Sequence, residues 1–531
     1  MIDPHEKYFG RGRTGKKWTL GGQNCNMESI SEQFDPYKGI FDCSEESFIN
    51  GHYPGTLFRF PLRECPSELS DTIYTKEKMI GLFKCFQTDA QLILLFLKRL
   101  ESIELYVRHE GDISPTKMFQ VRIAKDFIEE IRSKRKEFLE KISSPKELSE
   151  SVTVTYPVTI ETITYAEEEN YQIEKYSYIV TDYYSGDESS YELNKLSKDG
   201  SLSYLPWVGV AYPVPPKPDR SVLENEDKPA TEPCGHLFCF LPLPLSKQSP
   251  TGLPVHVNGF FALSKNRRHL KWPSADQDET QTLTDKALLW NRCLLREVIP
   301  KAYAKLLRET INHPSWRLQD SSVDAVYSLW PDMEKVDLKW KEATELFYKE
   351  ILYGHIVHTE ADKGKWIELQ EALLDNLQET SEVNKAIIST LCLANQNVVT
   401  APPHVMAAIK THYNNSTSEI TPSLVRHVLK NMHSVYNGFE STIKLCLLQY
   451  ILSDHNFRDL HGLELLPLSD GTFTTFKETG LEDESKVYIA SRDHPQTLLP
   501  GLEEMFLSQQ MDSKILHRLM KAAETGKHLN L

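Results

Sequence analysis

Residues 152–156 read VTVTY, with valine or tyrosine at every second position. This period of two is typical of a β-strand with one buried face. Residues 173–180 (IEKYSYIV) hold two tyrosines among further apolar residues, and residues 183–187 (YYSGD) follow as a turn. The sequence therefore predicts a β-rich region over residues 150–210, which gives the fold its β component.

Upstream of this region the pattern changes from strand to helix and back. Residues 55–63 (GTLFRFPLR) alternate in part and are rich in aromatic side chains, which predicts a strand. Met79, Phe83 and Phe86 recur at helical spacing. Residues 102–107 (SIELYV) predict another strand. This order of strand, helix and strand is typical of one edge of an α/β layer.

Downstream, the β-rich pattern is interrupted once. Residues 213–233 (PVPPKPDRSVLENEDKPATEP) combine prolines with charges and predict a flexible loop. Residues 237–243 and 253–261 then read as a pair of strands, with residues 249–252 (SPTG) as the turn between them. The β-rich pattern therefore continues beyond the loop.

Beyond Trp272 the sequence becomes helical. One helix is predicted by apolar residues at helical spacing: Tyr303, Leu306, Leu307 and Ile311. Thr421 and Pro422 predict a helix start, because threonine caps a helix and proline fits its first turn. Asp470 and Gly471 stand between apolar runs and predict a β-hairpin. These patterns together predict an α+β fold.

Composition limits the classes of function. The chain has 531 residues, enough for about three domains. It carries 60 Lys+Arg and 75 Asp+Glu, which gives a net charge of −15, and 40% of its residues are hydrophobic. The acidic balance argues against a general nucleic-acid binder and against simple docking onto anionic lipid, since both need a basic surface.

Several features predict a cytoplasmic protein. The longest apolar run, residues 92–97, is far shorter than the roughly 20 residues of a spanning helix, so no membrane insertion is expected. The N-terminal residues MIDPHE have no basic segment followed by an apolar one, so no signal peptide is predicted. Nine cysteines without framework spacing fit a reducing compartment.

No catalytic residue and no metal site are predicted. The chain has no G-x-S-x-G elbow and no C-x-x-C pair, and no residue marks a base or an oxyanion hole. Cys234, His236 and Cys239 are possible metal ligands, but zinc usually needs a second ligand pair, and none lies nearby. We expect these three residues to be core cysteines and a turn histidine.

Arg267 and Arg268 follow a predicted strand, in the loop sequence NRRH at residues 266–269. A planar guanidinium can bind phosphate or carboxylate through two hydrogen bonds. Two interpretations remain open. The arginines form a binding site for an anion, or they hold neighbouring carboxylates in place.

Several strings, in the same order along the chain, resemble the sacsin repeat family. They are FDPYKGIF (34–41), YPGTLFRFPLR (53–63), DAQLILLFLK (89–98), CFLPLP (239–244), TGLPVHVNGFFALSKNRRHLKW (251–272), LLREVIPKAYAKLL (294–307) and LELLPLSDGTF (463–473). The resemblance covers nearly the whole chain. Because the strings are long, unusual and co-linear, they are more specific than any single short motif.

The resemblance implies an ATPase-type domain related to the GHKL superfamily, followed by a middle-like region. That superfamily includes histidine kinases, gyrase, MutL and the ninety-kilodalton heat-shock chaperone. Gly55 and Thr56 resemble its last nucleotide-site motif, in which the threonine hydroxyl lies near the adenine. Arg267 and Arg268 lie in the part that resembles a chaperone middle domain, where a basic residue reaches the γ-phosphate. By resemblance, these four residues are candidates for nucleotide binding.

The superfamily's metal-holding helix, D-x-G-x-G turn and glycine-rich lid lie upstream of this motif. None is present here, and residues 1–5 (MIDPH) resemble the segment just past them. Phosphoryl transfer depends on positioning and on charge stabilisation, which those groups supply. We therefore expect no cofactor and no ATP hydrolysis in this chain, and ATP with magnesium only in a longer parent protein.

The predicted organisation has four regions. They are the end of a GHKL-type ATPase domain (1–110), a β-rich middle-like domain (111–275), a mainly helical region (276–420) and a helical region with a terminal β-hairpin (421–531). The fold class is thus α+β, with the end of a GHKL-like α/β sandwich before a mixed β-rich region and a helical C-terminal region.

The resemblance implies a chaperone or co-chaperone module for protein folding and quality control. Its implied partners are chaperones of the seventy-kilodalton heat-shock class and client proteins. Binding would use exposed apolar or β-edge surface, with residues 213–233 and the tyrosine-rich residues 171–191 as candidates, unless these are a plain linker and a half-buried sheet. Two alternatives are the C-terminal part of a functional ATPase whose nucleotide motifs lie upstream of Met1, and a scaffold with a degenerate nucleotide site.

Overall fold

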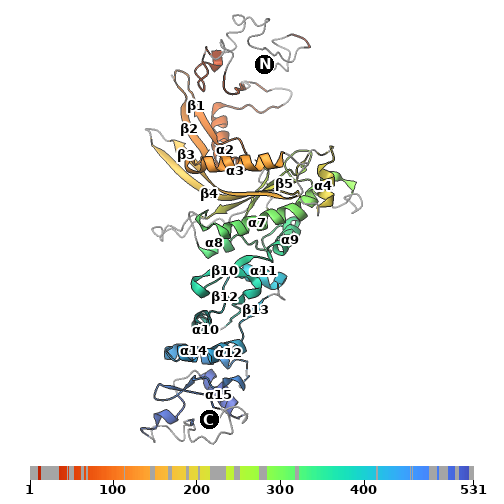
Figure 1. Cartoon of the computed structure of the whole chain (residues 1–531). Coiled ribbons are helices and arrows are strands. Elements are labelled where there is room, and N and C mark those ends of the chain that lie inside the picture. The colour runs from red at the N-terminus through yellow and green to blue at the C-terminus, as the bar shows by residue number, and fades with distance from the viewer. Residues whose placement is uncertain are drawn as a thin grey trace. The chain divides into compact units, whose positions relative to one another are not determined.

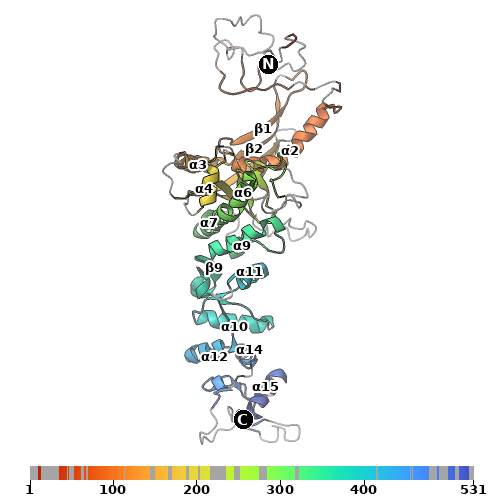
Figure 2. The same cartoon turned by 90° about the vertical axis from the view of Figure 1, so that its right-hand side faces the viewer.

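The computed structural model shows two compact units (Figures 1 and 2). Unit 1 comprises Met1–Ala124 and Ile160–Lys175, and unit 2 comprises Lys125–Thr159 and Tyr176–Leu531. The structure describes residues 10–12, 35–44, 46, 53–60, 62, 65–66, 70–112, 114–143, 150–165, 170–186, 190–200, 202, 204–215, 235–243, 251–273, 284–316, 322–378, 380–413, 417–454, 456, 458–477, 487–489, 500–508 and 513–524.

Unit 1 is an antiparallel sheet with a helix packed on it. Its elements are α2 (Lys76–Phe96), β1 (Ser102–Val107), β2 (Thr116–Ile123) and the adjacent ends of β3 (Val152–Tyr165) and β4 (Tyr171–Tyr184). The strand order is β1-β2-β3-β4. α2 packs on β2, where Leu94, Phe119 and Val121 are buried. The helix and the strand predicted at residues 79–86 and 102–107 are therefore confirmed.

The strand predicted at residues 55–63 is wrong for its described part, because residues 55–60 belong to no strand. Phe58 and Phe60 are 76% and 81% exposed, and their ring centroids lie 6.2 Å apart in a stacked arrangement. Alternation predicts a strand when it separates a buried face from a solvated one. Here the alternating aromatic side chains are themselves exposed, so their spacing of two residues does not indicate a β-strand with one buried face.

The sheet of unit 2 has the strand order β3-β4-β5-β8-β6-β7. Its further strands are β5 (Trp207–Val214), β6 (Leu237–Cys239), β7 (Leu241–Pro242) and β8 (His256–Gly259). β4 and β5 pair antiparallel, from Ser177 opposite Val214 to Tyr184 opposite Trp207. Of the loop predicted at residues 213–233, Pro213 and Val214 lie in β5, and residues 216–233 lie outside the described residues.

Strands form near residues 237–243 and 253–261, but they do not form the predicted hairpin. β6 and β8 run parallel, with Leu237 opposite Val257, and β6 pairs antiparallel with β7. Residues 249 and 250 of the predicted turn lie outside the described residues. Gly252 has a φ of +68°, and a Cβ there would lie 2.1 Å from the Lys335 carbonyl oxygen. A side chain would not fit here, because the backbone of Lys335 approaches this residue too closely, so the position requires glycine.

A helix covers each face of the unit 2 sheet (Figure 1). α3 (Ile128–Ile142) lies on the face that carries Tyr156 and Asp182. The Tyr156 hydroxyl donates to Asp182 Oδ2 at 2.9 Å, and Trp207 Nε1 donates to Asp182 Oδ1 at 3.1 Å. Arg135 Nε lies 3.3 Å from the Tyr156 hydroxyl. All four side chains are buried, so this polar network satisfies groups that would otherwise be costly to bury.

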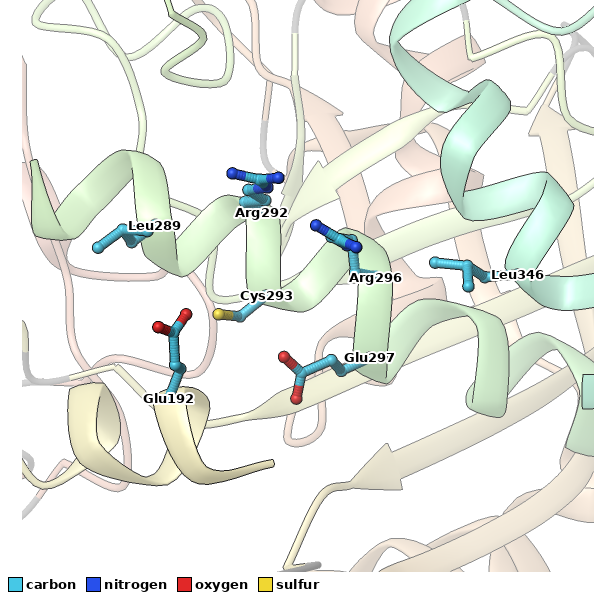
Figure 3. Close-up of a pocket in the computed structure, with 7 residues that line it drawn as sticks. All are labelled: Glu192, Leu289, Arg292, Cys293, Arg296, Glu297 and Leu346. Atoms are coloured by element: carbon cyan, nitrogen blue, oxygen red, sulfur yellow. The ribbon is translucent and has the colours of Figure 1, made fainter. Parts of the chain in front are cut away.

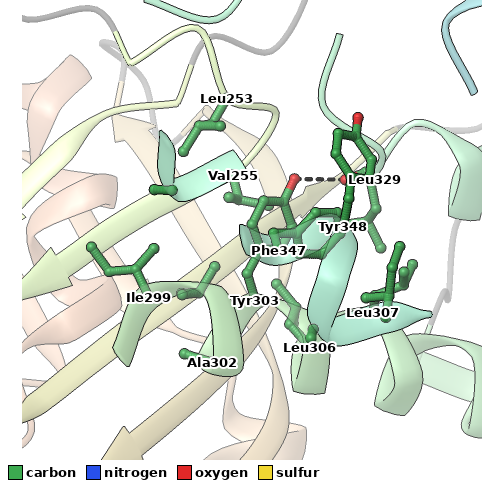
Figure 4. Packing of buried hydrophobic residues seen from close by; sticks show 14 of the residues in the cluster. Leu253, Val255, Ile299, Ala302, Tyr303, Leu306, Leu307, Leu329, Phe347 and Tyr348 are labelled. Atoms are coloured by element: carbon green, nitrogen blue, oxygen red, sulfur yellow. Dashed lines mark hydrogen bonds between the residues drawn. The ribbon is translucent and has the colours of Figure 1, made fainter. Parts of the chain in front are cut away.

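The opposite face of this sheet packs on α7 (Ile299–Asn312), which also packs on α9 (Lys341–Ile351). Tyr303 stacks on Phe347 with ring centroids 4.2 Å apart, and its hydroxyl donates to the Leu329 carbonyl at 2.6 Å (Figure 4). The predicted apolar face of α7 is buried and thereby confirmed: Tyr303, Leu306, Leu307 and Ile311.

The rest of unit 2 consists of helices and short strands. They are α4 (Tyr191–Ser197), α6 (Lys286–Cys293), α8 (Val323–Tyr327), β9 (His355–Thr359), β10 (Lys365–Glu368), β11 (Leu373–Leu374), α10 (Ser381–Leu393), β12 (Val398–Val399), α11 (Pro403–Tyr413), β13 (Ser418–Glu419), α12 (Pro422–Asn431), α13 (His433–Tyr436), α14 (Ser441–Ile451), β14 (Leu466–Pro467), β15 (Phe473–Thr474) and α15 (Ser513–Glu524). Thr421 caps α12 by accepting a hydrogen bond from the Leu424 amide, as predicted. β14 and β15 pair antiparallel around Asp470 and Gly471, which confirms the predicted hairpin.

The protein is therefore a mixed α+β protein with a curled sheet, which agrees with the predicted class (Figure 1). The division into four regions stays a prediction. In the part of the chain that the structure describes, no single helix is long and apolar enough to span a membrane. The bent pair Lys76–Gln87 and Asp89–Phe96 meets that test by length and composition.

Candidate functional site

A surface pocket of about 430 Å³ lies in unit 2, where α4, α6 and α9 approach one another (Figure 3). Its lining residues are Glu192, Leu289, Arg292, Cys293, Arg296, Glu297 and Leu346. Glu192 comes from α4 and Leu346 from α9, and the others come from α6 and the turn that follows it. One helical segment therefore supplies most of the pocket.

That segment contains a wide turn between α6 and α7. Leu294–Val298 form a π-helical turn, in which the Ile299 amide donates to the Leu294 carbonyl five residues earlier. Pro300 lies in the first turn of α7. Proline lacks an amide hydrogen, and its ring clashes with the carbonyl four residues before it, so a regular α-helix cannot run through it. The wide turn accommodates the proline, and such turns are frequent at functional sites.

The charges that line the pocket are balanced between two arginines and two glutamates. Arg296 Nε lies 3.2 Å from Glu342 Oε1. Arg292 is exposed, and no described residue pairs with it. Because Leu289 and Leu346 also line the pocket, it offers apolar contact as well as both signs of charge (Figure 3).

Cys293 is the thiol in this pocket, and it is not activated. Burial raises the pKa of the Cys293 thiol to about 12, with the carboxylates of Glu297 and Glu192 adding to the effect. The thiolate is the form that attacks electrophiles and binds metals. A thiol that stays protonated at neutral pH does neither.

Arg267 and Arg268 lie at the tip of an antiparallel turn between Leu263 and Leu270. Asn291 of α6 holds this turn through side-chain hydrogen bonds to its backbone. Its Oδ1 accepts from the Ala262 amide at 2.8 Å, and its Nδ2 donates to the Ala262 and Lys271 carbonyls at 2.8 and 3.0 Å. Asn291 is 2% exposed, so these three hydrogen bonds are made away from water.

Both arginine side chains are exposed, and Arg267 has a φ of +57°. Among the described residues, no carboxylate pairs with either guanidinium, so nothing described supports the interpretation that they hold neighbouring carboxylates. The interpretation as an anion-binding pair stays a prediction. The turn presents both groups on a hydrogen-bonded backbone, since the Arg267 amide donates to the Ser264 carbonyl at 2.8 Å.

Gly55 and Thr56 lie in unit 1, and both are exposed. A Cβ at Gly55 would lie 3.1 Å from Cε1 of Tyr53, so the glycine allows that ring to pack on the backbone. Magnesium needs oxygen ligands such as carboxylates. The described residues include no group of three or more His, Cys, Asp or Glu side chains that could hold a metal. The predicted contact at Thr56 stays a prediction.

Two of the three residues considered as metal ligands lie in the described part of the chain, His236 and Cys239. The His236 amide donates to His256 Nδ1 at 3.0 Å, and Cys239 Sγ lies 3.8 Å from the Phe261 carbonyl oxygen. Burial lowers the pKa of His256 to about 3, so this histidine is neutral at physiological pH. Cys234 lies outside the described residues. Cys239 is therefore the last residue of β6, and His236 directly precedes that strand.

Of the predicted site residues, Gly55 and Thr56 belong to unit 1, and Arg267 and Arg268 belong to unit 2. Sequence analysis missed the pocket beside α6. The available signal was Pro300 inside a helical pattern, which indicates an irregular turn and so a local change in the directions of neighbouring side chains.

The described elements define a mixed α+β protein with a surface pocket in unit 2. A sequence model of the family described as "Sacsin domain" matches residues 1–120. The chain is also similar to human Sacsin, with 35% identity over 539 residues that cover 99% of this chain. The chain is therefore a sacsin-like protein, which confirms the resemblance. It spans 11% of the human protein, so the activity and partners of that whole protein are proposals here.

Proposed function

We propose that the chain is a sacsin-like chaperone or co-chaperone module of the cytoplasm, which binds non-native polypeptides and does not hydrolyse ATP by itself. Its proposed partners are client polypeptides and chaperones of the seventy-kilodalton heat-shock class. Unit 1 is proposed to be the end of a GHKL-like α/β sandwich, because it packs α2 on one face of an antiparallel sheet. The sacsin-like sequence supports a sacsin-related role.

The observation that carries this proposal is the exposed apolar surface of unit 1. Its exposed large side chains are Phe41, Phe58, Phe60, Leu62, Tyr74, Leu82, Phe83, Leu100, Tyr171 and Ile173. A single exposed apolar residue is ordinary on a protein surface. Contiguous apolar side chains are typical of a surface that binds another polypeptide, and the stacked rings of Phe58 and Phe60 form such a contact.

Nucleotide binding at Gly55, Thr56, Arg267 and Arg268 is proposed only for a longer parent protein that supplies the remaining groups. No described residue adds support to the alternative of a functional ATPase fragment. ATP binding is measured by equilibrium dialysis with magnesium, and we expect no saturable binding at sub-millimolar nucleotide. Tight, magnesium-dependent binding that Thr56→Ala abolishes would contradict this part of the proposal.

The client-binding proposal is tested by light scattering of heat-denatured citrate synthase. The chain is expected to suppress aggregation at stoichiometric amounts, with or without ATP. The double variant Phe58→Asp and Phe60→Asp should lose most of the suppression, because it places charges on the exposed apolar surface. Leu338→Asp is the matched control, since Leu338 is 80% exposed but lies in unit 2. If the unmutated chain does not suppress aggregation, the proposal is wrong.

A further inference from the structure

The pocket beside α6 carries more negative than positive charge that is free to meet a ligand. Neither of its carboxylates, Glu192 and Glu297, pairs with a cation among the described residues. Of its two arginines, Arg296 is already engaged by Glu342, which does not line the pocket. Arg292 alone therefore stands against two carboxylates, and the pocket has a negative excess.

The segments that adjoin α4 and α6 along the chain do not offset this excess by their composition. The positions there that lie outside the described residues are 187–189 (DES), 201, 203 and 274–283 (SADQDETQTL). None of them is lysine, arginine or histidine, and several are acidic. The chain therefore provides no basic residue in the stretches next to these two helices.

The Cys293 thiol lies beside both carboxylates. Figure 3 shows its sulfur between the carboxylates of Glu192 and Glu297, with both guanidinium groups above them in this view. After burial, Glu297 and Glu192 are the next largest causes that raise the pKa of this thiol, and Arg292 and Arg296 lower it less. Cys293 is 4% exposed, and its sulfur makes no hydrogen bond with a described residue. A buried, unpaired sulfur thus faces the pocket in a negative potential, which attracts a cation.

The apolar part of the lining indicates which cation fits. Leu289 from α6 and Leu346 from α9 line the same pocket. A lysine side chain lays its hydrocarbon stem along apolar surface and keeps its ammonium group on polar partners. The ammonium group has three N–H donors, so it can bond to two carboxylates at once, and a thiol sulfur is a weak acceptor. The planar fork of a guanidinium instead matches a single carboxylate.

We propose that the pocket beside α6 binds a primary ammonium group on a flexible aliphatic chain. Glu192 and Glu297 hold the charge, and Leu289 and Leu346 contact the chain. Two sources carry this chemistry, a lysine side chain of a polypeptide and a free alkyl diamine. The pocket belongs to unit 2, whereas the apolar surface proposed to bind clients belongs to unit 1. The inference therefore goes beyond the proposed function and does not fail with it.

The test is saturation-transfer NMR of the full chain with a capped lysine, N-acetyl-lysine methylamide. Saturable binding is expected, with the strongest saturation at the methylene groups of the side chain. The matched ligand is the capped norleucine, which has the same four-carbon chain without the ammonium group. It should bind about tenfold more weakly or less, because it cannot form the charge-assisted hydrogen bonds. Equal binding of the two ligands, or no saturable binding of the capped lysine, would overturn the proposal.

Cadaverine separates the two sources, because it is lysine without the backbone groups. If it displaces the capped lysine and binds as tightly, a free diamine is a sufficient ligand. If it displaces the capped lysine but binds about tenfold more weakly, the backbone contributes and the ligand is a lysine of a polypeptide. Both results support an ammonium site. Simultaneous binding of cadaverine and capped lysine without competition would overturn the assignment to one pocket.

Carboxylate variants locate the site. The double variant Glu192→Gln and Glu297→Gln should weaken binding of the capped lysine about tenfold, because glutamine keeps the size of glutamate and removes its charge. If the double variant does not fold, Glu192→Gln alone gives the test at an exposed position of α4. The matched control is Glu345→Gln, which makes the same change at an exposed position of α9 that does not line the pocket. Unchanged binding by the carboxylate variants would overturn the proposal.

An arginine variant tests the sign of the bound charge. Arg292→Gln should bind the capped lysine at least as tightly as the unmutated chain, because it removes a cation that repels the ammonium group. Loss of binding in Arg292→Gln would mean that the ligand is held by the guanidinium, and would overturn the assignment of an ammonium site.

Discussion

Arg426 and Asp454 form a bidentate ion pair, with Nη1 2.9 Å from Oδ1 and Nη2 2.7 Å from Oδ2. Arg426 lies on α12, is fully buried, and also donates from Nη1 to the Ile451 carbonyl at 2.6 Å. The pair ties α12 to the segment that follows α14. Only the planar fork of arginine offers two parallel hydrogen bonds to a carboxylate, so a lysine could not replace it.

Asp454→Asn should destabilise the chain by roughly 3 kcal/mol at neutral pH, because it leaves a buried guanidinium without a counter-charge. The measurement is urea unfolding followed by circular dichroism. Glu129→Gln is the control, since the Glu129 side chain is 80% exposed in its ion pair with Arg132. Exposed pairs of this kind contribute about 0.5 kcal/mol or less. If Asp454→Asn and Glu129→Gln lower the free energy of unfolding by the same amount, the buried ion pair does not stabilise the chain more than an exposed one.

The same pair predicts a dependence on pH. Burial raises the pKa of Asp454, but the hydrogen bonds from Arg426 and the Asn456 amide lower it more, so it lies below its ordinary value of 3.8. A carboxylate with a lowered pKa stabilises the folded state above the unfolded pKa, and this contribution is lost as pH falls through the folded pKa. The stability difference between the unmutated chain and Asp454→Asn should therefore be constant near neutral pH and shrink below about pH 4. A difference that is the same at acid and neutral pH would contradict this.

Asn291→Ala should loosen the turn that carries Arg267 and Arg268. The substitution leaves the Ala262 amide and two carbonyls without their buried partner, which is expected to cost about 2 kcal/mol. Hydrogen exchange should accelerate at residues 262–271 more than elsewhere in unit 2. The matched control is Ser389→Ala, which removes one half-buried hydrogen bond within α10. Equal acceleration across unit 2 in Asn291→Ala would show a general loss of stability instead.

The sequence predicts the elements of this fold well where one local signal decides them. Thr421 fixes the start of α12, and residues 102–107 form the expected strand. The parallel pairing of β6 and β8 depends instead on β5, which holds β8 in place from a distant part of the chain. A turn residue such as Gly252 predicts a local reversal of the chain. In the structure, however, Gly252 has a φ of +68° and lies against the backbone of Lys335, which is far along the sequence.

The candidate site was less predictable than the fold. Arg267 and Arg268 are exposed in a turn, as expected, but the residue that holds the turn, Asn291, lies on a helix that local patterns do not connect with it. The pocket beside α6 depends on how α4 and α9 pack against that helix. The spacing of residues along the sequence does not show which helices pack together. The tyrosine-rich region divides into an exposed part and a buried part because β5 covers only the residues from Ser177 onward.

Cys293 should be unreactive toward iodoacetamide in the folded chain at pH 8. Its pKa of about 12 leaves a thiolate fraction about a thousandfold below that of an ordinary thiol, and burial limits access as well. Cys85 is exposed and serves as the internal control. Peptide mass spectrometry should show alkylation of Cys85 in the folded chain, and alkylation of Cys293 only after unfolding in urea. Rapid labelling of Cys293 in the folded chain would mean that the pocket activates its thiol after all.

Tyr156 and Asp182 should show coupled energies in a double-mutant cycle. Tyr156→Phe removes the hydroxyl that donates to Asp182, and Asp182→Asn removes the charge that strengthens this hydrogen bond. Each single variant is expected to lose about 1–3 kcal/mol, since hydrogen bonds to buried charged groups are the strong ones. The double variant should lose about 1 kcal/mol less than the sum, because the second substitution removes a bond that the first has already broken.

The control cycle combines Tyr156→Phe with Thr310→Val. The Thr310 hydroxyl donates to the Leu306 carbonyl on α7, which covers the other face of the sheet and shares no hydrogen bond with Tyr156. Urea unfolding of this pair should be additive within about 0.5 kcal/mol. Additivity in both cycles would mean that the carboxylate finds an equivalent partner when Tyr156 is lost. Coupling in the first cycle alone would identify the network under α3 as a specific stabilising contact of the sheet.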